Sequence, residues 1–454
     1  MASMMASTQS VTDLRRPKII VIDDDPTGSQ TVHSCLLLMR WDVDTLRLGL
    51  RDEAPIFFIL ANTRAMTPEQ ADRTTREVCR NLKVALAAEA IADFLIVSRS
   101  DSTLRGHYPV ETDAIADELG PFDAHFAIPA FFEGGRITRD GVHYLRVGDR
   151  DVPVHETEFA KDSVFGYRHS FLPAYVEEKT GGRIPADAVE RFSLADLRSP
   201  EGLAPRLMAL TENRCVAVDG EVQTDLDGFA QAAIAATAQG KRFLFRSAAS
   251  ILTSLAALPP QPTPPEAMAR FARSDRPGAV LVGSHVRKTT EQLEALLELP
   301  QVAAIKVAVE RLRQGDSAET LCQEILTTVR DRWSAGQTPV IYTSREELQF
   351  DSIESRLSFG VAVSALLMDI LRGLPTDIAF LISKGGITSN DTLSQGLALR
   401  SARLLGQILP GVSVVRTDPD HDRYPHLPVV LFPGNVGDRQ GLATATARLS
   451  GWPS

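Results

Sequence analysis

Three consecutive aspartates, Asp23, Asp24 and Asp25, follow an apolar stretch in the segment VIDDDPTGSQ (residues 21–30). Neighbouring carboxylates repel one another, and burying them is costly unless a cation or hydrogen-bond donors lie opposite. We therefore expect a positive group, or a ligand rich in hydroxyls, to face this segment. The Thr27-Gly28 pair that follows predicts a tight turn from a strand into a helix.

Polar residues also follow the next three apolar stretches, at residues 55–61, 93–98 and 125–130. Arginine binds a carboxylate or phosphate through two parallel hydrogen bonds, and Asp, Asn, Ser and Thr side chains suit the hydroxyls of a sugar. Four arginines in this set favour a sugar acid as the ligand over four separate surface ion pairs. The residues are Asn62, Thr63, Arg64, Arg99, Ser100, Asp101, Ser102, Thr103, Arg105, Glu133 and Arg136.

Glycine-containing loops follow apolar stretches in the second half of the chain. Gly283-Ser284-His285, SKGGITSND (383–391) and PGNVGD (433–438) each come after such a stretch. Loops of this kind present backbone N–H groups to an anion, and a following helix adds the field of its dipole. Three of them favour a site for nucleotide phosphates, although neither GxxxxGK[ST] nor GxGxxG occurs.

Short apolar runs alternate with amphipathic stretches throughout, which predicts strands buried on both faces and flanked by helices. We expect an α/β protein of two domains with mostly parallel sheets, in which ligands bind at the carboxyl ends of the strands. The strands are expected at 18–22, 55–61, 93–98, 125–130, 215–219, 242–246, 279–283, 304–309, 339–343, 378–383, 413–417 and 428–434. Residues 131–175 lack periodicity and predict an excursion with a short β-hairpin near HYLRVGDRDVPV.

Five prolines within residues 259–265 mark a boundary, because proline continues neither a helix nor a central strand. The expected organisation is a disordered tail (1–16), an N-terminal domain (17–258), a Pro-rich linker (259–277) and a C-terminal domain (278–454).

Composition narrows the function classes. The 454 residues carry a net charge of −10, which argues against binding to nucleic acid. No apolar run is long enough to span a membrane, and the first 16 residues lack the apolar core of a signal peptide. The four cysteines occur singly, which fits a cytoplasmic protein without structural zinc, and the histidine spacing matches no metal site, so we assign no residue to a metal.

An acid-binding domain that faces a phosphate-binding domain suggests phosphoryl transfer from ATP, with Mg²⁺ bridging the phosphates. One aspartate of the first segment would then orient or deprotonate the attacking hydroxyl, and another would help to hold the metal. We expect Asp24 and Asp25 to face the cleft as catalytic residues and Asp23 to be partly structural.

The chain resembles the four-carbon acid sugar kinase family, which was first described as a domain of unknown function. Across residues 18–450 the resemblance is carried, in order, by DDPTGS (24–29), SDSTLRG (100–106), IPAFFEGGRITRDGVHYL (128–145), GSHVRKTTEQ (283–292), SKGGITSND and PGNVGD. It implies ATP-dependent phosphorylation of the terminal hydroxyl of threonate, erythronate or a 3-oxo-tetronate. The chain departs from the usual pattern at His285-Val286, where Cys-Ser is common, and at the additional Asp23.

The same resemblance implies functional residues in each domain. The substrate would contact Asp24, Arg64 and the turn formed by Arg99, Ser100, Asp101 and Ser102, to which the strand-end pattern adds Arg105. ATP would contact Ser284, Gly385, Gly386, Ile387, Thr388 and Gly434. The expected partners are a small sugar acid and ATP, and a homo-oligomer is compatible with the sequence.

Two other functions stay open. Asp23-x-Asp25-x-Thr27 matches the DxDxT motif of haloacid-dehalogenase-type phosphatases, in which the first Asp attacks phosphorus and the second is the acid/base. Against this, Gly386 stands where that family needs a metal-binding Asp, and the two segments lie on opposite sides of the linker. The third possibility is a sugar-acid sensor or nucleotide-binding module, which would lack magnesium-dependent ATP turnover.

Overall fold

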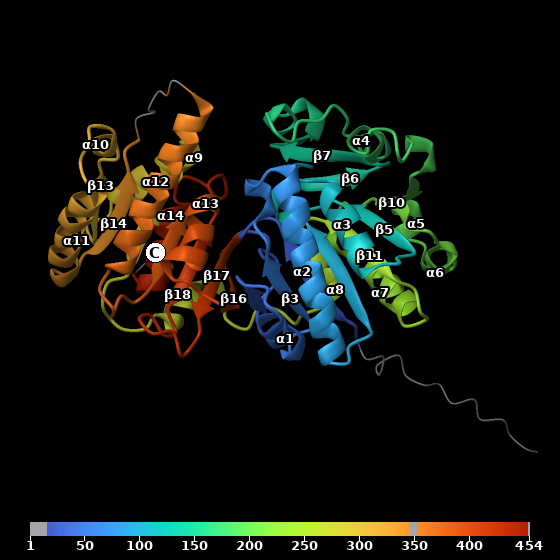
Figure 1. The fold of residues 1–454 in the computed structure, drawn as a ribbon, viewed down its shortest axis with the longest axis horizontal. Helices are drawn as coiled ribbons and strands as arrows, with labels where there is room; N and C mark the ends of the chain where they lie inside the picture. Colours follow the sequence, from blue (N-terminus) through green and yellow to red (C-terminus); the bar gives the residue numbers. More distant parts are fainter. Residues whose placement is uncertain (1–15, 346–349, 351, 453–454) are drawn as a thin grey trace, which may run out of the picture.

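The computed structural model describes residues 16–345, 350 and 352–452. The tail expected at residues 1–16 therefore lies, apart from Arg16, outside the described residues. Figure 1 shows the two halves of the chain side by side, each a sheet with helices packed on it. This confirms the predicted class, an α/β protein of two domains with a mostly parallel sheet.

The N-terminal half contributes eight strands to the main sheet and eight helices. Its strands are β1 (Lys18–Asp23), β2 (Leu36–Leu38), β3 (Ile56–Leu60), β4 (Phe94–Arg99), β5 (Ala124–Ile128), β9 (Glu190–Phe192), β10 (Arg214–Val218) and β11 (Phe243–Ser247). Its helices are α1 (Val43–Arg51), α2 (Pro68–Ala88), α3 (Val110–Leu119), α4 (Leu172–Lys179), α5 (Leu194–Leu197), α6 (Pro200–Ala209), α7 (Gln223–Thr237) and α8 (Ser250–Ala256).

A small antiparallel sheet lies above the N-terminal half in Figure 1, formed by β6 (Arg136–Arg139), β7 (Val142–Val147) and β8 (Arg150–Pro153). Strands β7 and β8 are the hairpin expected near HYLRVGDRDVPV, with Tyr144 opposite Pro153.

The C-terminal half contributes seven strands and six helices among the described residues. Its strands are β12 (Ala279–Val282), β13 (Val302–Val307), β14 (Thr338–Thr343), β15 (Leu381–Lys384), β16 (Ser401–Leu409), β17 (Val412–Thr417) and β18 (Pro428–Phe432). Its helices are α9 (Arg287–Leu297), α10 (Glu310–Arg313), α11 (Ala318–Ser334), α12 (Ile353–Arg372), α13 (Gly386–Asp391) and α14 (Gly441–Ser450). None of the described helices is both long and apolar enough to cross a membrane.

The strands of both halves form one sheet in the order β13-β14-β12-β15-β18-β17-β16-β2-β3-β1-β4-β11-β5-β10-β9. The halves join where β16 pairs antiparallel with β2, with Ala402 opposite Leu37. Both residues are fully buried in a hydrophobic cluster that continues from one half into the other. The segment predicted as a linker also packs on the C-terminal half, because Pro265–Phe271 is a 3-10 helix whose Met268 is fully buried.

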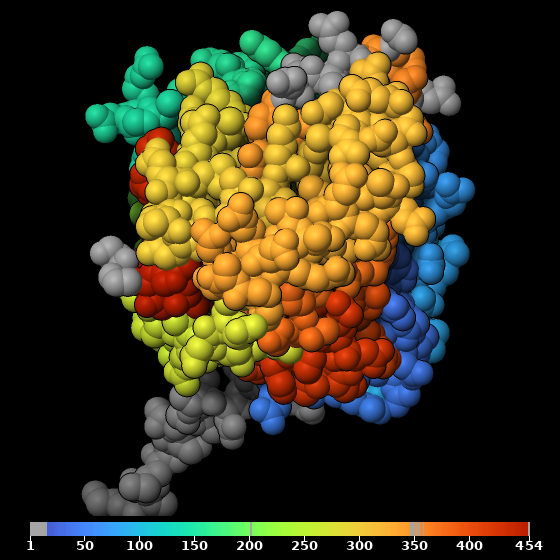
Figure 2. Space-filling model, turned by 90° about the vertical axis from the view of Figure 1, so that its left-hand side faces the viewer, coloured from blue at the N-terminus to red at the C-terminus, as the bar shows by residue number. Residues whose placement is uncertain are grey.

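Three antiparallel pairings, of β2 with β16, β16 with β17 and β17 with β18, leave β18 and the four strands beyond it antiparallel to the N-terminal strands. Strand ends from both halves nevertheless line one cleft. A sheet twists by about 20–25° from one strand to the next. Accumulated over the strands that separate β1 from β15, this twist turns the two sets of carboxyl ends toward each other. Figure 2, seen from the side of the C-terminal half, shows how broadly that half covers the other.

Candidate functional site

A cleft of about 780 Å³ lies between the two halves. From the N-terminal half it is lined by Asp25, Thr27, Gln30, Arg64, Arg99, Asp101, Ser102, Thr103, Arg105, Phe131, Glu133, Gly134, Arg136 and Phe159. From the C-terminal half it is lined by Gly386, residues 409–411 and 433–438, Gly441 and Thr444. These residues come from the polar strand ends and from two of the glycine loops that the sequence singles out.

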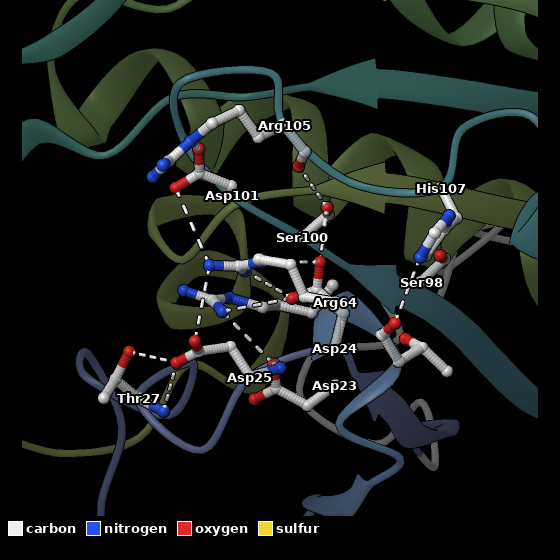
Figure 3. Close-up of polar contacts among 12 residues, drawn as sticks. Asp23, Asp24, Asp25, Thr27, Arg64, Ser98, Ser100, Asp101, Arg105 and His107 are labelled. Atoms are coloured by element: carbon white, nitrogen blue, oxygen red, sulfur yellow. Dashed lines mark hydrogen bonds and ion pairs between the residues drawn. The ribbon is translucent and has the colours of Figure 1, made fainter. Parts of the chain in front are cut away.

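Asp24 is buried behind the cleft rather than exposed to it, and only 1% of its side chain is accessible. The Arg64 guanidinium donates a hydrogen bond to Asp24 Oδ1 (2.5 Å), and the Ser100 hydroxyl donates to Oδ2 (2.7 Å; Figure 3). Burial raises the pKa of Asp24, although Arg64 acts in the opposite direction. The expectation that Asp24 faces the cleft is therefore wrong, and its geometry is that of a group that holds Arg64 and Ser100 in place.

Asp23 is buried as well, which agrees with a partly structural role. Its Oδ1 accepts hydrogen bonds from Arg99 Nη1 (3.2 Å) and from the backbone N–H of Asp25 (3.2 Å). Burial raises the pKa of Asp23 to about 7. The turn requires glycine at residue 28, since a Cβ at Gly28 would overlap the Asp23 carboxylate.

Asp25 is the aspartate of the three that lines the cleft, and 20% of its side chain is exposed. Its Oδ1 accepts hydrogen bonds from the backbone N–H (2.8 Å) and the hydroxyl of Thr27, and its Oδ2 accepts one from Arg64 Nη1 (3.4 Å; Figure 3). Burial opposes ionisation here, but Arg64 and Arg99 outweigh it and hold the pKa of Asp25 below its usual value. Asp25 is thus an ionised carboxylate that a ligand can reach.

The turn after β4 surrounds these aspartates. Asp101 accepts a hydrogen bond from Arg105 Nε (2.8 Å) and another from the Thr103 hydroxyl, and its Oδ1 lies 3.9 Å from Arg64 Nη1. Burial would raise the pKa of Asp101, but Arg64 and Arg105 hold it well below its usual range. The structure thus brings together all the N-terminal residues of the predicted site: Asp24, Asp25, Arg64, Arg99, Ser100, Asp101, Ser102 and Arg105.

A buried ion pair supports this cluster from behind, and sequence reasoning missed it. Arg246, at the end of β11, donates to Glu111 on α3 (2.6 Å) and to the Ser100 hydroxyl (2.8 Å). Glu111 also accepts a hydrogen bond from Thr63 (2.5 Å). Arg246 is the last residue of a strand that the sequence did predict, so its place at a carboxyl end was an available signal.

The predicted nucleotide residues also lie together in the C-terminal half. A Cβ at Gly385 (φ 125°) would lie 3.0 Å from Ser284 Cβ and 3.1 Å from Thr388 Oγ1, and one at Gly434 would lie 3.0 Å from Ser284 Oγ. Glycine at these positions leaves room beside the Ser284 hydroxyl, whereas the backbone N–H of Gly385 already donates to the carbonyl of Phe432 (2.8 Å). The side chain of Ile387 is exposed, with 73% of its surface accessible.

Lys384, which sequence reasoning also passed over, fixes the loop that carries Gly434. Its ammonium donates to the carbonyls of Pro433 (2.5 Å) and Gly434 (3.3 Å) and lies 4.1 Å from the centre of the Phe432 ring. The side chain is fully buried, and burial lowers the pKa of Lys384 to about 7.

The two halves of the site meet at Gly386. A Cβ at this residue would lie 3.7 Å from Asp25 Oδ2. The DxDxT-like segment and SKGGITSND are thus neighbours in space. The expectation that their separation along the chain keeps them out of one compact site is wrong. Gly386 still offers no carboxylate, and across the described ranges no three His, Cys, Asp or Glu side chains gather as a metal site.

The fold and the site define a two-domain α/β protein that sets a polar cluster suited to a hydroxylated acid against glycine loops suited to phosphates. A family model described as a sugar-binding N-terminal domain matches residues 19–255, and one described as a nucleotide-binding C-terminal domain matches residues 279–442. The chain therefore belongs to the four-carbon acid sugar kinase family, DUF1537.

Named relatives agree with this assignment, and a solved structure shares the fold. The chain is 26% identical to a D-erythronate kinase of Heliobacterium modesticaldum over 94% of its own length and 95% of that protein. It is 28% identical to a D-threonate kinase of Bordetella bronchiseptica over 39% of its length and 45% of that protein. A Salmonella typhimurium LT2 structure shares the fold, with a TM-score of 0.69, 19% identity and coverage of 94% of this chain and 98% of that one.

Proposed function

We propose that this protein is an ATP-dependent kinase that phosphorylates the terminal hydroxyl of a four-carbon sugar acid: threonate, erythronate or a 3-oxo-tetronate. The observation that carries the proposal is the position of Asp25, an ionised carboxylate of the sugar-binding half, beside Gly386 at the start of the phosphate-type loop. The names of the relatives, D-erythronate kinase and D-threonate kinase, support the same class of substrate.

In this proposal Asp25 accepts the proton of the attacking hydroxyl or orients that hydroxyl toward the phosphate. A positioned general base of this kind contributes about 10²- to 10⁴-fold to a rate. Asp24 acts through Arg64, because the hydrogen bonds between them fix the guanidinium that also contacts Asp25. Ser102 and Asp101, which line the cleft, would bind the other hydroxyls of the substrate.

The C-terminal half would bind ATP through Ser284, the backbone of residues 385–388 and Gly434. The donor set also fits Mg²⁺ that arrives with the triphosphate, because proteins bind this ion through one or two carboxylates and leave its other positions to phosphate oxygens and water. Asp25 is a cleft carboxylate beside Gly386 of one phosphate-type loop, and Asp438 lines the cleft from another. Magnesium at this place would neutralise charge that develops on the phosphate oxygens.

The test is ADP formation from Mg-ATP with a panel of acids: D- and L-threonate, D- and L-erythronate, their 3-oxo forms, and glycerate as a three-carbon control. Turnover of a four-carbon acid that exceeds turnover of glycerate would support the proposal and identify the substrate. ATP binding without turnover of any acid would favour a binding module instead. Phosphate release from a phosphorylated sugar acid without ATP would favour the phosphatase alternative.

A further inference from the structure

Four arginines line the cleft, and three of them are already neutralised by carboxylates of the protein. Arg64 pairs with Asp24 (2.5 Å), Arg99 with Asp23 (3.2 Å) and Arg105 with Asp101 (2.8 Å). The fourth, Arg136, has no carboxylate oxygen within 4.0 Å among the residues that the structure describes.

Arg136 is nevertheless held in a defined position. Its backbone exchanges two hydrogen bonds with Phe131 (2.9 and 3.0 Å), and its guanidinium lies 6.0 Å from the centre of the Phe131 ring. Nη1 donates to the Gly134 carbonyl, and a Cβ at Gly134 would overlap that nitrogen. Nε is buried, and within the described part of the chain it has no hydrogen-bond partner. The cleft thus presents a fixed guanidinium that the protein itself leaves unneutralised.

Arg136 lies at one end of a row of polar groups in the cleft. Arg64 Nη1 lies 3.4 Å from Asp25 and 3.9 Å from Asp101, so the polar groups of the cleft run from Asp25, beside the nucleotide loop, to Asp101 and its partner Arg105. The strand that begins with Arg136 lies against the turn that carries Asp101, because the Thr138 hydroxyl is hydrogen-bonded to His143 (2.9 Å) and His143 to the Ser102 carbonyl (2.8 Å). Arg136 therefore belongs to the Asp101 end of this row.

We propose that Arg136 binds the carboxylate of the sugar acid and so selects acids over neutral sugars of the same length. This inference rests on the proposed function: a substrate whose terminal hydroxyl lies at Asp25 extends its carboxylate toward the Asp101 end. A guanidinium suits a carboxylate because it offers two parallel N–H groups. Arg64 and Arg99, which the strand-end pattern also nominated for this task, are occupied by Asp23, Asp24 and Asp25.

The test compares a four-carbon acid with its alditol, which lacks the carboxylate, in the wild-type protein and in Arg136→Gln and Arg136→Lys. Calorimetry gives the dissociation constants, and ADP formation gives KM and kcat. These values complete a cycle in which the protein loses the guanidinium or the ligand loses the carboxylate. Arg139→Gln is the matched control, because Arg139 lies on the same strand, pairs with Asp151 and Glu221, and does not line the cleft. Thermal melting shows that each variant is folded.

We expect Arg136→Gln to weaken acid binding by about 10- to 100-fold, the range for a lost charge-assisted hydrogen bond, and to bring it to the level of the alditol in the wild-type protein. Binding of the alditol should change by less than about twofold, Arg136→Lys should recover part of the acid affinity, and Arg139→Gln should have no effect.

Equal losses for acid and alditol would overturn the proposal, and a higher KM for ATP would overturn it and place Arg136 at the phosphoryl group. Unchanged acid binding in Arg136→Gln would overturn it too. The failure of the proposed function looks different: the wild-type protein would then consume no ATP with any acid, while calorimetry would still report whether the acid depends on Arg136.

Discussion

Removing Arg246 while keeping Glu111 should strongly destabilise the N-terminal half. Their nitrogen and oxygen atoms lie 2.6 Å apart, and the two side chains are only 10% and 5% exposed. Breaking a buried pair costs about 3–5 kcal/mol, because the remaining carboxylate, although it keeps its hydrogen bond from Thr63, has lost its counter-charge. Arg246→Met keeps an unbranched side chain in the space, so we expect the free energy of unfolding to fall by that amount.

Removing both charges together should cost much less, since well-packed apolar replacements of a buried pair are often neutral. The double variant Arg246→Met/Glu111→Leu should therefore be more stable than Arg246→Met alone. Urea unfolding followed by circular dichroism measures all three proteins, with Arg242→Met as the control: Arg242 has a carbonyl partner, Leu119, and should cost only about 1 kcal/mol. The prediction is wrong if Arg246→Met lowers the free energy of unfolding by less than about 1 kcal/mol, or if the double variant is less stable than Arg246→Met.

Three further predictions follow from the same geometry. Gly385→Ala should lower the free energy of unfolding by about 1–3 kcal/mol and weaken ATP binding, because the φ of 125° at Gly385 is almost exclusive to glycine. Gly386→Ala is the control and should melt like the wild type, and melting curves and ATP titrations compare the two variants. Asp25→Asn should lower kcat by about 10²- to 10⁴-fold, and a kcat near the wild-type value would contradict its role. The pKa of Asp23 is raised from 3.8 to about 7 in the folded protein, so its protonation stabilises the fold fully below pH 3.8 and no longer does so above about pH 7. Asp23→Asn should therefore flatten the fall in stability between these pH values, and urea unfolding at several pH values measures this.

The sequence predicted the strands well because most are buried on both faces. All the strands expected from apolar runs are present, among them β1 with five fully buried residues after Lys18. Their carboxyl ends then brought Asp25, Arg64 and Asp101 together, since parallel strands end at the same edge of a sheet. The strand expected at 378–383 begins only at Leu381, although the three residues before it are buried.

The features that the sequence did not predict depend on contacts between distant segments. The join of the halves needs β2, a three-residue strand, to find β16 across most of the chain, and such a short run carries no pattern of its own. Glu111 and Arg246 become partners because β11 lies between β4 and β5. The turn after β1 decides that Asp25, and not Asp24, reaches the cleft, and that depends on the bonds to Arg64, Thr27 and Ser100.

Phosphorus NMR of the reaction product shows whether the terminal hydroxyl is phosphorylated. With Mg-ATP and the four-carbon acid that gives the highest turnover, we expect ADP and one phosphate monoester whose signal is split into a triplet by the two protons of the terminal carbon. Release of inorganic phosphate without a sugar phosphate, or a monoester coupled to a single proton, would contradict this expectation.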